Sequence, residues 1–125
     1  MSLITKEQLL SLAEPATQVV TIKGVGDVRI KVMDGFARDA LQKALQDLGT
    51  SDSVYFSAVI IATVIDENGE PLFTPEELAV LRAKNAAFIQ KIGLECVRVN
   101  ALGDAQTKDA EKNSDAIQSN SSGTA

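Results

Sequence analysis

The spacing of apolar residues changes along the chain, and each spacing predicts a different element. Residues 18–22 and 27–32 are rich in Val, Ile and Thr and flank a turn at residues 23–26, which predicts a β-hairpin over residues 18–32. Two strands alone are only marginally stable in water, so this hairpin must pack on helices or pair with another subunit. Residues 34–48 carry apolar side chains at helical spacing, which predicts an amphipathic helix.

Capping residues mark the ends of the predicted helices. Thr5 followed three residues later by Gln8 is the pattern of a capping box, which predicts a short helix over residues 6–13. Asp34 is the expected N-cap of the amphipathic helix, and Gly49 is its expected end.

The segment from Val54 to Ile65 is apolar on all sides, and a helix without a polar face must be covered on all sides. Its many β-branched residues make a strand the main alternative. Twelve residues exceed the usual length of a strand, so we predict a buried helix over residues 54–65.

A polar turn and a second capping pattern follow this segment. Thr74 precedes Glu77 by three residues, and Pro75 occupies the first helical position, where its missing N–H removes no helical hydrogen bond. The pattern predicts a helix over residues 75–102. The residues expected to build the turn and the cap are Asp66, Gly69, Phe73, Thr74 and Glu77.

The apolar positions of the predicted last helix form one seam along its length, and Gly93 in its middle predicts a bend or a break. Such a seam is either internal core or a partner surface. Because a long helix extends beyond a small domain, we expect part of the seam to bind a partner. The candidate partner-binding residues are Leu81, Phe88, Ile92 and Val99.

These elements predict one globular domain over residues 1–103 and an α+β fold that is mainly α. In it, a short N-terminal helix and a β-hairpin pack on a small helical domain with a long C-terminal helix. After Gly103 the chain has Ile117 as its only large apolar residue, which predicts a disordered tail over residues 104–125.

Composition excludes several classes of function. Twelve basic and seventeen acidic residues give a net charge of −5, the wrong sign for holding nucleic acid or an anionic membrane surface. The longest apolar run has twelve residues, fewer than the roughly twenty that a membrane-spanning helix needs. Without histidine, the chain lacks the commonest general base and metal ligand, so we expect neither an enzyme nor a cofactor. The single cysteine, Cys96, is expected in the core and excludes an internal disulfide.

Two motifs resemble ligand sites but lack a required residue. Asp66 begins a possible calcium loop, yet its sixth position holds Pro71 where a sharp turn needs glycine. Gly24 and Gly26 could begin a phosphate loop, but the third glycine is replaced by Arg29 and a strand follows. We therefore expect no metal site here and assign the glycines to the hairpin turn.

The order of an apolar helix, the segment VIDENGEPLFT and a capped helix resembles the tail assembly chaperones of long-tailed bacteriophages, in their short non-frameshifted form. The resemblance covers residues 19–102. It implies a protein that binds the tape-measure protein and keeps it soluble until the tail-tube protein polymerises around it. It also implies self-association, a place in the host cytoplasm and absence from the mature virion.

The family resemblance further implies a longer form made by ribosomal frameshifting, for which Glu111-Lys112-Asn113 permits a slippery codon string in the tail. Two alternatives stay open from the residues alone. The chain could be a structural tail component, or a small cytoplasmic adaptor that binds another protein.

Overall fold

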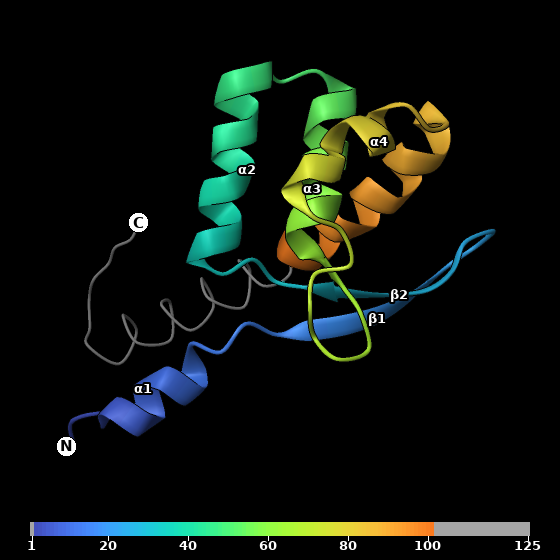
Figure 1. Ribbon diagram of the computed structural model, residues 1–125. Coiled ribbons are helices and arrows are strands. Elements are labelled where there is room, and N and C mark those ends of the chain that lie inside the picture. The colour runs from blue at the N-terminus through green and yellow to red at the C-terminus, as the bar shows by residue number, and fades with distance from the viewer. Residues whose placement is uncertain (1, 102–125) are drawn as a thin grey trace, which may run out of the picture.

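Helices cover one face of a small antiparallel sheet in the computed structural model, which describes residues 2–101 (Figure 1). The fold is α+β and mainly α, as predicted. Its elements are α1 (Lys6–Leu12), β1 (Thr17–Ile22), β2 (Gly26–Lys31), α2 (Gly35–Leu48), α3 (Asp52–Thr63), β3 (Val64–Ile65), η1 (Pro75–Glu77), α4 (Leu78–Arg82) and a last helix over residues 86–101. The predicted tail over residues 104–125, the domain end at 103 and the helix end at 102 lie outside the described residues.

The predicted hairpin is confirmed and forms two strands of the sheet, whose order is β1-β2-β3. Its turn places Gly24 and Gly26 at φ values of 82° and 119°, which residues with a side chain rarely adopt. The side chains of Val20, Ile22 and Ile30 point to the helical face and are buried. The hairpin therefore packs on helices and supplies the floor of the core.

The predicted helix over residues 54–65 is correct in type but wrong at both ends. α3 begins at Asp52 and ends at Thr63, and the next two residues form β3, where Val64 pairs with Ile30 of β2. Val64 adopts extended backbone angles, φ −80° and ψ 128°. A β-branched pair that can join an existing strand gains cross-strand packing, which outweighs one more helical turn.

The predicted helix over residues 75–102 is wrong as one unit. It comprises η1, α4 and the last helix, and the break lies at residues 83–85, not at Gly93. The Asn85 side chain accepts a hydrogen bond from the Phe88 N–H at 3.0 Å, the geometry of a helix N-cap. Asn85 therefore starts a new helix and interrupts the continuous seam expected over residues 75–102.

Gly93 lies inside the last helix, which continues through it, and allows this helix to approach α3 closely. A Cβ built at residue 93 would lie 2.6 Å from Cδ1 and 2.9 Å from Cβ of Phe56. The glycine is required by the packing of two helices, and the expected bend or break at this position is wrong.

The predicted capping residues of the first two helices are confirmed. Thr5 and Gln8 form the capping box of α1, with hydrogen bonds of 2.9 and 3.1 Å. Asp34 caps α2 by accepting a hydrogen bond from the Ala37 N–H at 2.8 Å, and Gly49 ends α2 at φ 92°. These signals lie within a few residues of each other in sequence.

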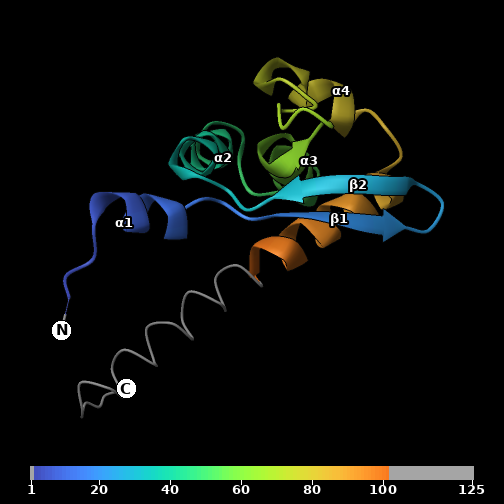
Figure 2. The ribbon, with the colours of Figure 1, turned by 90° about the horizontal axis from the view of Figure 1, so that it is seen from below.

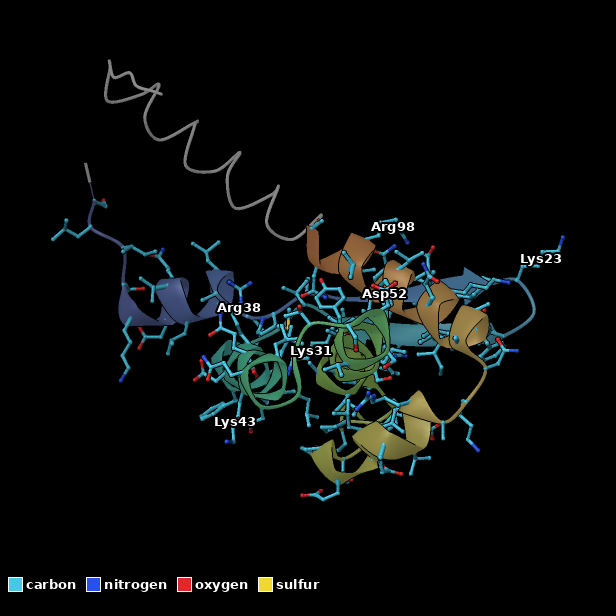
Figure 3. The ribbon with its side chains drawn as sticks, turned by 90° about the horizontal axis from the view of Figure 1, so that it is seen from above. Lys23, Lys31, Arg38, Lys43, Asp52 and Arg98 are labelled. Atoms are coloured by element: carbon cyan, nitrogen blue, oxygen red, sulfur yellow. The ribbon has the colours of Figure 1, made fainter. Side chains whose placement is uncertain are left out.

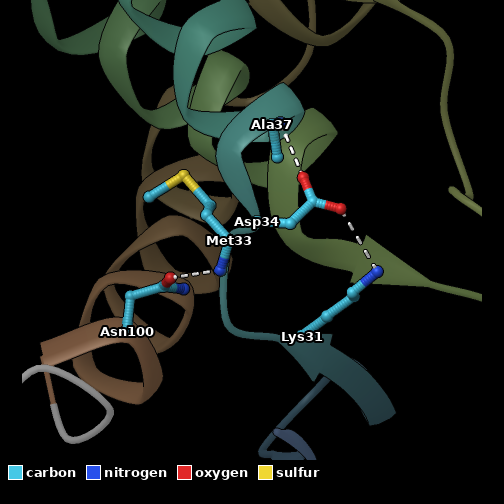
Figure 4. Close-up of polar contacts among 5 residues, drawn as sticks. All are labelled: Lys31, Met33, Asp34, Ala37 and Asn100. Atoms are coloured by element: carbon cyan, nitrogen blue, oxygen red, sulfur yellow. Dashed lines mark hydrogen bonds and ion pairs between the residues drawn. The ribbon is translucent and has the colours of Figure 1, made fainter. Parts of the chain in front are cut away.

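A polar junction ties the last helix to the start of α2 (Figure 4). The Met33 N–H donates to Asn100 Oδ1 at 2.9 Å, and the Asn100 amide donates to the Cys96 carbonyl at the same distance. Lys31 pairs with the carboxylate of Asp34 at 3.7 Å. Asn100 thus fixes the C-terminal part of the last helix against the strand-to-helix connection.

Ser57 on α3 is fully buried, and its hydroxyl has no hydrogen-bond partner among the described residues. An unsatisfied buried hydroxyl costs about 1–3 kcal/mol, so Ser57→Ala is expected to keep the free energy of unfolding or raise it by about 1 kcal/mol. The matched variant is Thr63→Val, because the Thr63 hydroxyl is equally buried but donates to the Val59 carbonyl at 2.8 Å. Urea denaturation should show Thr63→Val to be about 1 kcal/mol less stable than the parent protein. Equal losses in the two variants would contradict this account.

Candidate binding groove

An apolar groove of about 550 Å³ opens between the hairpin, the turn after β3, α4 and the start of the last helix. We call it the helix groove. Its lining contains one charged side chain, that of Lys84. The lining residues are Val25, Val28, Ile60, Val64, Leu72, Phe73, Val80, Leu81, Lys84, Asn85, Phe88, Ile89 and Ile92.

The floor and the rim of the helix groove differ in exposure. Leu81 and Ile89 on the floor are 6% and 7% exposed and belong to the core. On the rim, Leu72, Val80 and Phe88 are 53%, 51% and 44% exposed. These three large apolar side chains form an exposed apolar patch on the rim. Such a patch is typical of an association site.

The break at Asn85 creates this groove. In a single straight helix, the residues of α4 and of the last helix would lie along one line. Because the chain breaks between them, Val80 of α4 and Phe88 of the last helix line the same groove from two directions. Arg82 Nε donates to Ser53 Oγ at 3.0 Å and so holds α4 against α3. The groove is therefore a consequence of a local capping signal combined with long-range packing.

The predicted structural turn forms one wall of the groove. The Asp66 carboxylate accepts hydrogen bonds from the N–H groups of Asn68 and Glu70 at 2.8 and 3.0 Å. Gly69 adopts φ 83° in this turn. The turn then leads into Leu72, whose N–H donates to the Val64 carbonyl at 3.0 Å. The Oδ1 atom of Asp66 thus accepts both hydrogen bonds from backbone groups of its own turn, and the turn fixes the position of Leu72 and Phe73.

The second capping pattern forms at the end of this turn. The Glu77 carboxylate accepts a hydrogen bond from the Thr74 N–H at 2.8 Å, and the Glu77 N–H donates to the Thr74 carbonyl at 3.0 Å. The first turn after Thr74 is the 3-10 helix η1, and α4 continues from it. Thr74 and Glu77 therefore form the helix cap that the sequence pattern predicts.

The four predicted partner-binding residues separate into two groups. Phe88 and Ile92 line the helix groove, and Leu81 lies on its floor. Val99 is 3% exposed in the core and does not line the groove, so it presents no surface to a partner in this conformation. The buried positions of the last helix are Ile89, Cys96 and Val99, which share one face at helical spacing.

Sequence reasoning missed the groove residues contributed by other elements. Leu72 follows the polar turn, Val80 lies in α4, and Val25 and Val28 lie in the hairpin, so only the tertiary structure brings these residues together. Leu72 follows the polar turn directly, which was the one local signal that could have suggested an exposed apolar residue.

A second apolar hollow of about 310 Å³ lies between α2, α3 and the turn, and shares Phe73 and Val64 with the helix groove. Alanines line much of it, and Phe36 at its edge is 89% exposed. The lining alanines are Ala37, Ala40, Ala44, Ala58 and Ala62. This hollow carries no residue of the predicted partner-binding set.

Cys96 lies in the core with no exposed surface. Burial raises the pKa of its thiol from an ordinary value of 9.0 to about 11, and a hydrogen bond with Thr63 opposes this only in part. At neutral pH the group is a protonated, buried thiol, and thiolate chemistry is unavailable to it.

Residues 2–101 hold no cluster of three or more Cys, Asp or Glu side chains able to bind a metal ion. Within the same residues, no helix combines the length and apolar content needed to cross a membrane. Comparison of the chain with protein-family models, with curated proteins and with solved structures finds no match. The helix groove must therefore be interpreted from its own geometry.

Proposed function

We propose that this protein is a tail assembly chaperone that binds apolar helical segments of a phage tape-measure protein in the helix groove. The observation that carries the proposal is the exposed apolar rim of Leu72, Val80 and Phe88 above a buried floor. The sequence resemblance supplies the class of client, and the groove supplies a surface suited to it.

The shape of the groove favours a helix as its occupant. An amphipathic helix presents apolar side chains at positions i, i+3, i+4 and i+7, and such helices bind in apolar grooves between helices. Main-chain recognition of an extended peptide would require an open strand edge, and α4 and the last helix present none to this groove. Lys84 at the edge would favour acidic residues flanking the apolar stripe of the client.

The role is binding rather than catalysis. The chaperone would shield the client's apolar helices until the tail-tube protein displaces it, acting in the host cytoplasm and leaving before the virion is complete. The net charge of −5 would keep the complex soluble. This role does not require a cofactor.

Co-expression with the tape-measure protein of the same phage tests the proposal. The parent protein is expected to keep the tape-measure protein in the supernatant after ultracentrifugation. Phe88→Asp is expected to reduce that soluble fraction several-fold, because a carboxylate at the rim must be desolvated when an apolar helix binds.

Phe36→Asp is the matched control, because Phe36 is also a phenylalanine exposed at the surface but lies outside the helix groove. It is expected to preserve the soluble fraction. If the parent protein leaves the client insoluble, the chaperone function is wrong. If Phe88→Asp and Phe36→Asp behave alike, the function stands and the groove is not its site.

A further inference from the structure

The two edges of the sheet differ in whether another segment of the chain covers them. The outer edge of β3 is covered, because Ile65 forms a bridge with Pro71 and the Leu72 N–H donates to the Val64 carbonyl at 3.0 Å. The outer edge of β1 has no partner strand within residues 2–101. Figure 2 shows β1 on the side of the sheet away from α4.

β1 lacks the features that usually keep an open edge from pairing. Natural edge strands carry charged side chains, proline or a bulge. The sequence of β1 is TQVVTI, with no charge and no proline, and its register with β2 is continuous from Thr17 to Ile22. An open, uncharged and regular edge of this kind is suited to pairing with another strand.

The hydrogen bonds of the hairpin show which backbone groups point outward. The Val32 N–H donates to the Ala16 carbonyl at 2.9 Å, so these two residues face each other as a hydrogen-bonded pair. Bonded pairs alternate along an antiparallel ladder. The backbone groups of Thr17, Val19 and Thr21 therefore point to the open edge, and their side chains lie on the face opposite the core.

We propose that the edge of β1 binds the β1 strand of a second copy of this chain, antiparallel and around a two-fold axis at Val19. This register places Val19 opposite Val19 and Thr17 opposite Thr21 of the second copy. It uses all three residues with outward backbone groups, and each bonded pair exchanges two hydrogen bonds. The result is one continuous six-stranded sheet built from two three-stranded sheets.

The side chains along this register are compatible with a second copy. Val19, which is 52% exposed, meets its equivalent, and threonine meets threonine, so no like charges face each other. The same register continued outward places Pro15 opposite Lys23 of the second copy, with Glu14 beside it. Lys23 is exposed at the hairpin tip (Figure 3), and Lys91 Nζ donates to its carbonyl, adding a second positive charge there.

Charge complementarity therefore selects a second copy over an unrelated strand. The symmetry brings Glu14 of each copy to the basic hairpin tip of the other, so the attraction occurs twice. The register also carries α1, whose Leu9, Leu10 and Leu12 are 51%, 57% and 79% exposed, past the hairpin tip of the second copy. The pairing is independent of the client bound in the helix groove.

Disulfide formation tests the register. Bonded antiparallel residues have Cα atoms about 5.5 Å apart, within the range that a disulfide spans. Val19→Cys is expected to form a covalent dimer under mild oxidation, while Thr21→Cys, which would face Thr17, is expected to remain uncrosslinked. The native Cys96 is buried and does not interfere. Equal crosslinking of both variants, or crosslinking of Thr21→Cys alone, would overturn the register.

Sedimentation velocity over a concentration series tests the interface itself. The parent protein and Val19→Thr are expected to dimerise, and Val19→Pro, which lacks the outward N–H, is expected to stay monomeric. Glu14→Lys and Lys23→Glu are each expected to raise the dimer dissociation constant about tenfold, and the double variant to restore it. A parent protein that is monomeric at every concentration, or a charge-swapped pair that shows no rescue, overturns the proposal.

Discussion

Gly93→Val is expected to destabilise the protein by about 3 kcal/mol, although valine has a higher helix propensity than glycine. The reason is the contact between the last helix and α3, where a Cβ at residue 93 would lie 2.6 Å from Phe56 Cδ1 and 2.9 Å from its Cβ. The Phe56 Cβ is fixed by the backbone of α3, so the side chain cannot simply rotate away. Gly93→Ala should lose about 1–2 kcal/mol, since a propensity gain of about 1 kcal/mol offsets part of the steric cost.

Gly35→Ala is the matched control, because Gly35 begins α2 and a Cβ there would meet no atom within 4 Å. It is expected to be neutral or slightly stabilising by urea denaturation. In a Phe56→Gly background, which also removes the Phe56 Cβ, Gly93→Ala should change sign and stabilise the protein by up to about 1 kcal/mol. If Gly93→Ala stabilises the parent protein as much as Gly35→Ala does, the close helix contact is absent in solution.

The free energy of unfolding is expected to fall by about 2 kcal/mol between pH 9 and pH 11 because of Cys96 alone. Burial raises the pKa of this thiol from 9.0 to about 11 in the folded protein, so the folded state holds the proton more tightly than the unfolded chain does. The stabilising contribution is complete below pH 9, where both states are protonated. It is lost as the pH rises towards the folded pKa, because the unfolded thiol ionises first.

Cys96→Ala isolates this effect. Every other ionisable group is the same in the two proteins, so the difference between the two pH profiles belongs to the thiol. The unfolding free energy of Cys96→Ala, measured by urea denaturation from pH 8 to pH 11, should decline less steeply than that of the parent protein. Parallel profiles would falsify the burial of an intact, protonated thiol.

The elements with local signals were predictable from sequence. Thr5 with Gln8, Asp34 before α2 and the glycines of the hairpin turn each act within a few residues of themselves, through a hydrogen bond or a backbone angle. Such signals operate in the same way wherever the segment lies in the fold. The helix cap at Asn85 was of the same kind, and we missed it because an apolar seam on both sides suggested continuity.

The candidate site was only half predictable. Phe88 and Ile92 were identified from the seam of the last helix, whereas Val99 of the same seam lies in the core. Helical spacing shows which residues share a face, but it does not show which part of that face another element covers. The missing half of the groove comes from the hairpin, the turn and α4.

By itself, the sequence determined the class of the fold, the hairpin and the capped helices, because hydrogen bonds and backbone angles of neighbouring residues specify them. Only the tertiary structure decided that Val64 and Ile65 join the sheet, that Gly93 serves a helix contact and that Val80 and Phe88 share one groove. Those features depend on segments far apart in the chain. Their stability comes from the surface that distant residues bury together, which no local pattern records.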